Sequence, residues 1–235
     1  MQANTVCIPF YFRCHAANNS KLFITTFYCF RMNVEIHIAN SSFIHYAQAV
    51  CDLIYESAQA RGTGIAKRSA EYVAEKINSG KAVIALDGDK LVGFAYIETF
   101  SHKRFVANSG LVVHPDYRNM GLAKKIKRRI FDLSRKLYPH AKIFSITTGL
   151  AVMKMNTELG FKPVTFSELT DDEEFWKGCQ GCRNYDILQR NDYKMCLCTG
   201  LLYDPSTKPV QASSFAKKVV KPVVKKKAPN KLYKK

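Results

Sequence analysis

Two spacings of apolar side chains divide the chain into elements of two kinds. Apolar residues that recur every three or four positions predict amphipathic helices, whereas strict alternation or a short apolar run between turn residues predicts strands. The helical spacing covers residues 43–60, 69–77, 123–138 and 151–159. The strand patterns cover residues 34–38, 82–86, 91–99, 105–113, 142–148 and 161–164. This order of elements predicts a mixed α/β (α+β) domain.

Turn and capping residues support these boundaries. Ser69 belongs to the residue types that cap helix N-termini, and Gly160 stands where a helix C-terminal glycine is expected. The run Asp87-Gly88-Asp89 lies between two apolar segments, which is a strong signal for a hairpin turn. We therefore expect the segments on either side of this turn to pair as antiparallel strands.

Positive charge is concentrated at the two ends of the chain. Of the formal net charge of +17, the ten lysines of residues 207–235 supply +10 and residues 1–31 supply +3, which leaves +4 for residues 32–206. The lysine-rich end has too few large apolar side chains to offset the chain entropy of folding, so we expect a disordered tail there. Nucleic acid is expected to contact only this tail, without sequence specificity.

Four segments follow from these patterns. Residues 1–31 are expected to lie outside the core, and Met32 is an alternative physiological start because an alternating strand begins directly after it. Residues 32–168 are expected to form the globular domain. Residues 169–206 are expected to be a cysteine-rich extension packed on that domain, followed by the tail of residues 207–235.

The apolar segments are short. The chain has no apolar run of the ~18 residues that a membrane-spanning helix needs, and its start lacks the pattern of a secretory signal. We expect a cytoplasmic protein with no membrane partner. Composition leaves the oligomeric state open, with a homodimer as one option.

The most informative stretch is residues 111–123, in which a strand pattern is followed by a tight turn and a long basic helix. A helix N-terminus presents unpaired backbone N–H groups and a partial positive charge, so it can bind a pyrophosphate. Gly121 and Ala123 leave room for close approach of such a group. The turn reads Arg118-Asn119-Met120-Gly121-Leu122-Ala123.

This turn resembles the acyl-CoA signature of the GNAT acetyltransferases, which is Arg or Gln, two residues, Gly, one residue, and Gly or Ala. The similarity extends over residues 33–166 and includes the closing motif Glu158-Leu159-Gly160-Phe161. It implies the GNAT fold, with a mostly antiparallel mixed sheet flanked by helices, and an N-acetyltransferase that uses acetyl-CoA. By the same resemblance, the pantetheine arm pairs with the backbone of Val112 and Val113. The pyrophosphate binds at Arg118, Asn119, Met120, Gly121, Leu122, Ala123 and Lys124.

One position departs from the family pattern. Many members carry a tyrosine general acid where this chain has Asn156. Asparagine cannot deliver a proton by ionising, so we expect Asn156 to hydrogen-bond the thioester or the CoA sulfur, with the proton supplied by another group or by water. The backbone N–H at Val113 or nearby is expected to polarise the thioester carbonyl while a neutral amine attacks. Glu98 is the candidate base, the alternative being a solvent-facing strand residue.

A second resemblance concerns the acceptor. Residues 61–69 together with Thr147 and Thr148 are similar to the acetyltransferase domain of N-acetylglutamate synthases, which implies that Arg68, with Lys67 as an auxiliary, recognises an acceptor carboxylate. Arg68 could equally be a surface residue before a helix cap. The expected acceptor is a small amino acid such as glutamate, in amino-acid biosynthesis. Three alternatives stay open: a protein or peptide acceptor, a polyamine or aminoglycoside, and a non-catalytic nucleic-acid-associated protein that uses the lysine tail. The acyl group, acetyl or a longer acid such as succinyl, also stays open.

Four cysteines stand close together in the extension. Cys179, Cys182, Cys196 and Cys198 have a spacing compatible with a tetrahedral structural zinc, and four reduced thiols are the alternative. If the metal fixes the extension beside the acceptor site, four side chains could reach the substrate: Trp176, Arg183, Asn184 and Tyr185.

Overall fold

The structure is a computed structural model that describes residues 5–15, 21–31, 33–61 and 67–207. The predicted tail therefore lies outside the described residues apart from its first position, as do Met32 and residues 62–66 of the segment that resembles N-acetylglutamate synthases.

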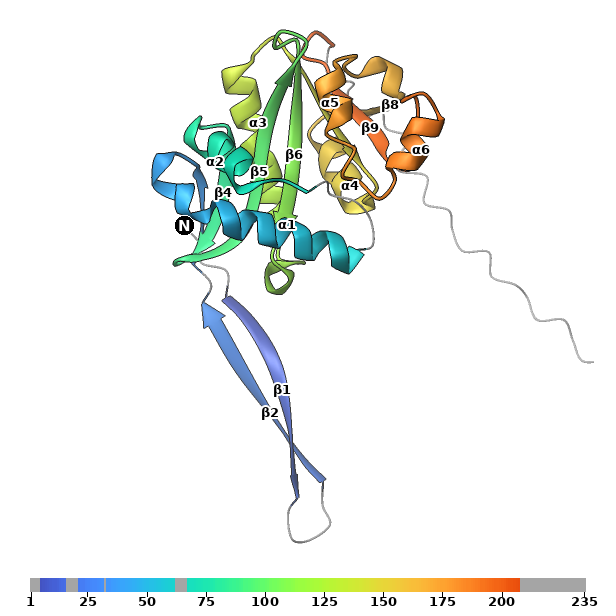
Figure 1. Ribbon diagram of the computed structural model, residues 1–235. Coiled ribbons are helices and arrows are strands. Elements are labelled where there is room, and N and C mark those ends of the chain that lie inside the picture. Colours follow the sequence, from blue (N-terminus) through green and yellow to red (C-terminus); the bar gives the residue numbers. More distant parts are fainter. Residues whose placement is uncertain (1–4, 16–20, 32, 62–66, 208–235) are drawn as a thin grey trace, which may run out of the picture.

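A seven-stranded sheet forms the centre of the molecule, with the strand order β3-β4-β5-β6-β7-β9-β8 (Figure 1). Neighbouring strands are antiparallel except for β6 and β7, which are parallel. The strands are β3 Val34–Ile38, β4 Ala82–Asp87, β5 Lys90–Phe100, β6 Phe105–Val113, β7 Lys142–Thr147, β8 Lys162–Val164 and β9 Thr199–Tyr203. All six strands predicted from the sequence pattern are present in this sheet.

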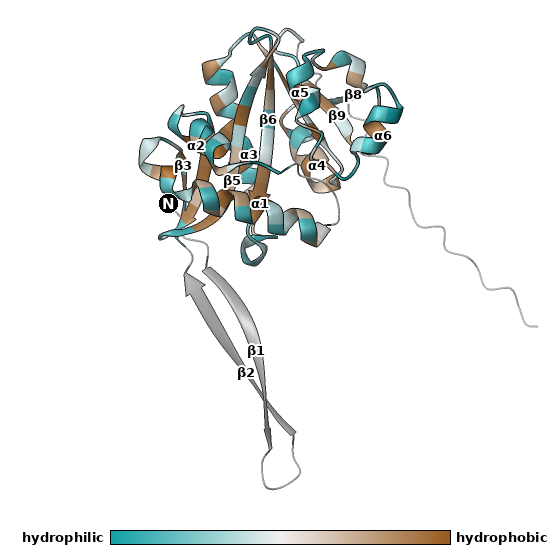
Figure 2. Cartoon of the chain, viewed as in Figure 1, coloured by the Kyte–Doolittle hydropathy of each residue, from teal (hydrophilic) through white to brown (hydrophobic). Residues whose placement is uncertain are grey.

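Helices cover both faces of the sheet, which explains why β4 and most of β5 are runs of buried, mainly apolar residues (Figure 2). On one face, α1 and α2 pack on Ile84, Phe94 and Tyr96. On the other, α3 packs on Val83 and Ala95. The helices of this domain are α1 Ala47–Arg61, α2 Ala70–Asn78, α3 Leu122–Leu137 and α4 Leu150–Glu158, with short 3-10 turns η1 Ser41–Tyr46, η2 Pro115–Tyr117 and η3 Phe166–Glu168.

The cysteine-rich extension contributes a strand to the central sheet. It contains α5 Glu173–Lys177, α6 Tyr185–Arg190 and β9, and β9 lies between β7 and β8. The sequence pattern missed β9 because Thr-Gly-Leu-Leu-Tyr shows no alternation of polar and apolar residues. Trp176 is buried in a cluster with Phe144 and Leu202, so this part of the extension packs on the sheet.

The N-terminal strands stand apart from this sheet. β1 Thr5–His15 and β2 Lys21–Arg31 pair only with each other, in antiparallel register (Figure 1). The boundaries assigned to this segment and the alternative start at Met32 stay predictions. Within the described parts of the chain, no helix combines the length and the apolar character needed to cross a bilayer.

Candidate active site

The parallel strands β6 and β7 pair at one end only. Three residues of each are in register, Phe105–Ala107 with 142–144, and the strands pair no further. A cavity of about 390 Å³ lies where they part, lined by residues 107–111 of β6 and 144–149 at the end of β7. Strands that separate leave backbone N–H and C=O groups without a ladder partner, and an extended ligand with amide groups can pair with them as an added strand.

A β-bulge in β6 lies at the same place. Phe94 pairs with Val112 and Tyr96 with Ser109, so two residues of β6 stand opposite one residue of β5. Such a bulge bends its strand. Gly110, within the bulge, has a φ of +65°, and a Cβ atom added there would lie 2.3 Å from Cε1 of Tyr96. Only glycine fits this position, and the signal in the sequence was a lone glycine within a strand pattern.

The turn that opens α3 has the geometry of an anion site. Gly121 precedes the helix with a φ of 76°, no side chain caps the helix, and its first turn contains no acidic residue. A Cβ atom added to Gly121 would meet nothing within 4 Å, so the space in front of these N–H groups is open. Asn119 also has a positive φ, of 62°. Helix α3 is 16 residues long, which gives its N-terminus a full macrodipole.

Two basic side chains of this turn have protein partners. Arg118 donates from Nε to the carbonyl oxygen of Val113 at 3.1 Å and from Nη2 to Oγ of Ser57 at 3.2 Å, and thereby ties the turn to β6 and α1. Lys124 forms an ion pair with Glu158 of α4, with Nζ and Oε2 2.6 Å apart. Both groups of that pair are exposed, so the pair contributes little to stability and leaves the ammonium available to a ligand.

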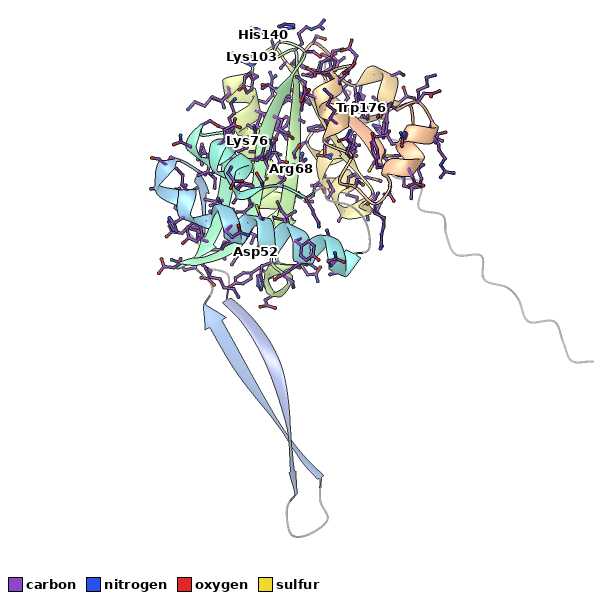
Figure 3. The ribbon with its side chains drawn as sticks, in the orientation of Figure 1. Asp52, Arg68, Lys76, Lys103, His140 and Trp176 are labelled. Atoms are coloured by element: carbon purple, nitrogen blue, oxygen red, sulfur yellow. The ribbon has the colours of Figure 1, made fainter. Side chains whose placement is uncertain are left out.

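Arg68 and Glu98, predicted from separate patterns, line the same cavity. The alternation of β5 places Phe94, Tyr96 and Glu98 on one face of the sheet. Arg68 donates from Nε to the hydroxyl oxygen of Tyr96 at 2.8 Å. Figure 3 shows Arg68 on the side of the sheet that faces the extension carrying Trp176.

Two tyrosines connect these groups. The hydroxyl of Tyr72 donates a short hydrogen bond to Oε1 of Glu98. Burial and the nearby Glu98 carboxylate raise the pKa of Tyr72 well above its usual range and the pKa of Tyr96 to about 12. Both phenols are therefore neutral at neutral pH. Tyr72 donates to Glu98 and Tyr96 accepts from Arg68, so the two tyrosines hold Glu98 and Arg68 in defined positions.

The extension forms the opposite wall of the cavity. Asn184 and Tyr185 line it, together with Glu174, and their predicted contact with the substrate stays a prediction. Trp176 does not line the cavity: it is buried and donates from Nε1 to the carbonyl oxygen of Thr170 at 3.0 Å. All four cysteines of the extension also contribute to this wall.

The arrangement of the four cysteines gives no support to the predicted zinc site. Among the described residues, no group of three or more His, Cys, Asp or Glu side chains is arranged to hold a metal ion. Instead Cys196 and Cys198 hydrogen-bond each other, and the Cys198 backbone N donates to Sγ of Cys196 at 3.3 Å. These two bonds hold the pKa of Cys196 below the usual thiol range, whereas burial and the neighbouring Cys182 raise the pKa of Cys179 to about 12.

Asn156 occupies an unexpected environment. Its side chain is 0% exposed, and neither its amide nitrogen nor its amide oxygen has a hydrogen-bond partner among the described residues. It is not one of the residues that line the cavity. Its predicted contact with the CoA sulfur stays a prediction. The cavity reaches α4 at Val152, and the contact requires it to extend to Asn156 when the cosubstrate is bound.

A buried lysine under the cavity was not predicted from the sequence. Lys127 of α3 is 2% exposed and donates from Nζ to Oδ1 of Asn108 at 3.2 Å. Asn108 lines the cavity and donates in turn to Oγ of Ser134 at 2.8 Å. Burial lowers the pKa of Lys127 to about 7. The amphipathic pattern gave no signal, because a lysine usually lies on the exposed face of such a helix.

Comparisons with known proteins agree with this geometry. Residues 51–161 match the model of the acetyltransferase (GNAT) family. Residues 51–161 therefore belong to a GNAT acetyltransferase domain. No curated protein matches the chain by sequence.

Solved structures show the same fold. One is the N-acetylglutamate synthase of Neisseria gonorrhoeae in complex with coenzyme A and N-acetyl-glutamate, at 19% identity and a TM-score of 0.53, with 76% of this chain and 37% of that chain covered. The chain thus spans little more than a third of that synthase. Diaminobutyrate acetyltransferase EctA of Paenibacillus lautus, in complex with L-2,4-diaminobutyric acid and coenzyme A, has 10% identity and a TM-score of 0.52, with 77% of this chain and 99% of that chain covered. An acetyltransferase of the GNAT family from Staphylococcus aureus Mu50 has 14% identity and a TM-score of 0.54, with 73% of this chain and 99% of that chain covered.

Proposed function

We propose that the protein is an acyl-CoA-dependent N-acetyltransferase whose acceptor is the amine of a small amino acid, with glutamate as the first candidate. The observation that carries this proposal is the convergence of Arg68 and Glu98 in one cavity at the opening between β6 and β7. A guanidinium suits the acceptor carboxylate, and a carboxylate suits the acceptor amine.

The cosubstrate is assigned to the opening and the turn next to it. Backbone N–H groups from Asn119 to Ala123 bind the pyrophosphate, aided by Lys124. The pantetheine arm then follows β6 past Val112 and Val113 as an added strand, which brings the thioester to the cavity. Arg118 supports this site by holding the turn against β6.

The reaction is direct acyl transfer. The neutral amine forms a bond to the thioester carbonyl carbon, a backbone N–H of β6 stabilises the oxyanion, and the carbon–sulfur bond breaks to release the CoA thiolate. Glu98, oriented by the Tyr72 hydroxyl, accepts the proton that the amine loses, directly or through water. A water molecule protonates the thiolate, since Asn156 has no proton to give by ionisation.

Two of the similar structures were solved with amino-acid ligands, N-acetyl-glutamate and L-2,4-diaminobutyric acid. The first ligand supports an acidic acceptor. The cavity also contains Glu174, so its lining carries the carboxylates of Glu98 and Glu174 and the guanidinium of Arg68. This excess of negative charge favours an acceptor with a second amine. A diamino acid is therefore the second candidate. A glutamate acceptor would place the enzyme in amino-acid biosynthesis.

The test is CoA release from acetyl-CoA with a panel of acceptors: glutamate, 2,4-diaminobutyrate, a polyamine, an aminoglycoside and a basic peptide. The variants are Arg68→Ala and, as a control, Arg129→Ala, which removes an exposed arginine of α3. We expect turnover with glutamate, a KM for glutamate raised roughly 100-fold in Arg68→Ala, and no change in the control. Turnover only with polyamine, aminoglycoside or peptide would overturn the amino-acid acceptor. Absence of turnover with every acceptor would overturn the assignment of acetyl-CoA as donor.

A further inference from the structure

One hydrogen-bond donor in the wall of the cavity has no partner. Asn184 is 8% exposed, and its amide Nδ2 makes no hydrogen bond among the described residues. The same residue lines the cavity. Native proteins pair nearly all buried donors because an unpaired one is costly, so an unpaired buried N–H group on a residue that lines a cavity points to a ligand atom that accepts from it.

The side chain of Asn184 does not cap helix α6. Asn184 stands directly before α6, where an asparagine side chain commonly caps the helix, yet it makes no capping hydrogen bond. The backbone of Asn184 is nevertheless fixed, because its N–H donates to Sγ of Cys182 at 3.4 Å. Adjacent turns also hold it: Cys182 N donates to the Cys179 carbonyl oxygen at 2.8 Å, and Tyr185 N to the Cys182 carbonyl oxygen at 3.0 Å.

Tyr185 and Glu174, which line the same wall, do not offer what Asn184 offers, an unpaired neutral hydrogen-bond donor. The Tyr185 hydroxyl lies 3.0 Å from the hydroxyl of Tyr193, with which it hydrogen-bonds. Glu174 is a carboxylate and accepts rather than donates. Arg68, across the cavity, shares its Nε with Tyr96 and carries the positive charge that a carboxylate needs. Asn184 therefore adds a neutral donor at a second point, on the wall formed by the extension.

We propose that Asn184 is a specificity-determining residue, whose Nδ2 donates a hydrogen bond to a side-chain oxygen of the amino-acid acceptor. This inference rests on the proposed function and extends it. The acceptor then has three recognised groups: an α-carboxylate at Arg68, an amine at Glu98, and a side-chain carboxylate or amide oxygen at Asn184. The cysteine-rich extension serves as the scaffold that presents Asn184, with no metal required.

The experiment compares three acceptors that share an α-amino acid head: glutamate, glutamine and norvaline, which has the same number of carbon atoms but no side-chain oxygen. Steady-state kinetics are measured for the wild type, Asn184→Asp and Asn184→Ala. Asn184→Asp keeps the shape and replaces the donor by an anionic acceptor. The matched control is Asn191→Asp at the other end of α6, since Asn191 donates to the carbonyl oxygen of Ile187 at 2.7 Å and does not line the cavity.

We expect the wild type to prefer glutamate or glutamine to norvaline in kcat/KM by roughly 10- to 100-fold, and both Asn184 variants to lose most of this preference. Norvaline turnover, the KM for acetyl-CoA and the Asn191→Asp control should stay within about twofold of the wild type. If the oxygen is a carboxylate, Asn184→Asp should penalise glutamate more than glutamine, because two anions repel. If it is an amide oxygen, both variants should penalise glutamine most.

Two results would overturn the inference alone: an unchanged preference in both Asn184 variants, or an equal loss for norvaline and glutamate, which would indicate a structural role. Wild-type protein that acetylates no amino acid but does acetylate another amine would overturn the proposed acceptor, and this inference with it. The wild-type panel and the variant comparison therefore separate failure of the proposed function from failure of the inference.

Discussion

Nε of Arg68 lies 2.8 Å from the hydroxyl oxygen of Tyr96, which joins a loop residue to the centre of the sheet. Tyr96 is 1% exposed and lies in the middle of β5. An arginine attached in this way has a defined direction, so it can present its remaining guanidinium N–H groups to a ligand at little entropic cost. Arg68 is therefore positioned by the core, unlike a solvated surface arginine before a helix.

Tyr96→Phe tests this positioning. The change removes the oxygen that accepts from Arg68 and keeps the aromatic ring. We expect the KM for the amino-acid acceptor to rise about 5- to 20-fold, with the KM for acetyl-CoA unchanged. Equal effects on both KM values in steady-state kinetics would mean that Tyr96 supports the whole site rather than Arg68.

Gly110→Ala tests the β-bulge. Its φ of +65° disfavours any side chain, and the new Cβ would lie 2.3 Å from the Tyr96 ring. Gly88→Ala is the matched control, because Gly88 has a φ of +57° with nothing within 4 Å. Urea unfolding should show that Gly88→Ala lowers the free energy of unfolding by about 1 kcal/mol, and that Gly110→Ala lowers it by at least ~2 kcal/mol more. Equal decreases in the two variants would show that the Tyr96 ring moves aside with no cost in free energy of unfolding.

Gly121→Glu tests the turn before α3. The free protein has open space at this position, and the new side chain would occupy the room assigned to the pyrophosphate and repel it. We expect the Kd of acetyl-CoA, measured by calorimetry, to rise at least ~50-fold. Gly88→Glu introduces the same residue at another exposed positive-φ position and should bind normally. Normal affinity in Gly121→Glu would place the pyrophosphate elsewhere.

Lys127 makes stability depend on pH. Its pKa falls from 10.5 to about 7 on folding because the ammonium is buried. Below pH 7 the lysine is charged in both the folded and the unfolded state, and the folded state bears the full free-energy cost of burying that charge. Between pH 7 and 10.5 the unfolded chain binds a proton that the folded chain does not, so the free energy of unfolding rises with pH.

Lys127→Met removes this group. We expect the variant to be more stable at pH 7 by on the order of 2 kcal/mol, and to lose the rise in unfolding free energy between pH 7 and 10. Lys125→Met, at an exposed position of the same helix, should retain the wild-type slope. A wild-type slope in Lys127→Met would assign the pH dependence to another group.

Cys196 is expected to be the most reactive thiol of the extension. Hydrogen bonds from Cys198 hold the pKa of Cys196 below the usual thiol range, whereas burial raises the pKa of Cys179 to about 12. Alkylation by iodoacetamide, followed site by site with mass spectrometry, should therefore begin at a lower pH for Cys196 than for Cys179. Cys179 should remain almost unreacted at pH 8. A Cys196 rate that rises only above pH 8 would contradict the hydrogen bonds from Cys198.

The elements of the domain could be predicted from the sequence because their signals are local. Helical spacing, alternation, the Asp87-Gly88-Asp89 turn and the Arg118–Ala123 run each depend on neighbours a few positions apart, and each appears in the structure near its predicted place. The two candidate residues Arg68 and Glu98 were found through a resemblance and a strand pattern. Neither signal said that they share a cavity.

The sequence by itself thus determined the class of fold, the order of its elements and the glycine turn before α3. The tertiary structure alone decided that β9 enters between β7 and β8, that β6 and β7 part at a bulge, that Lys127 lies inside, and that Asn184 lines the cavity. The reason is physical: periodicity reports which side of an element is buried, whereas a site depends on distances between side chains far apart in the chain, and only the packed sheet and its extension set those distances.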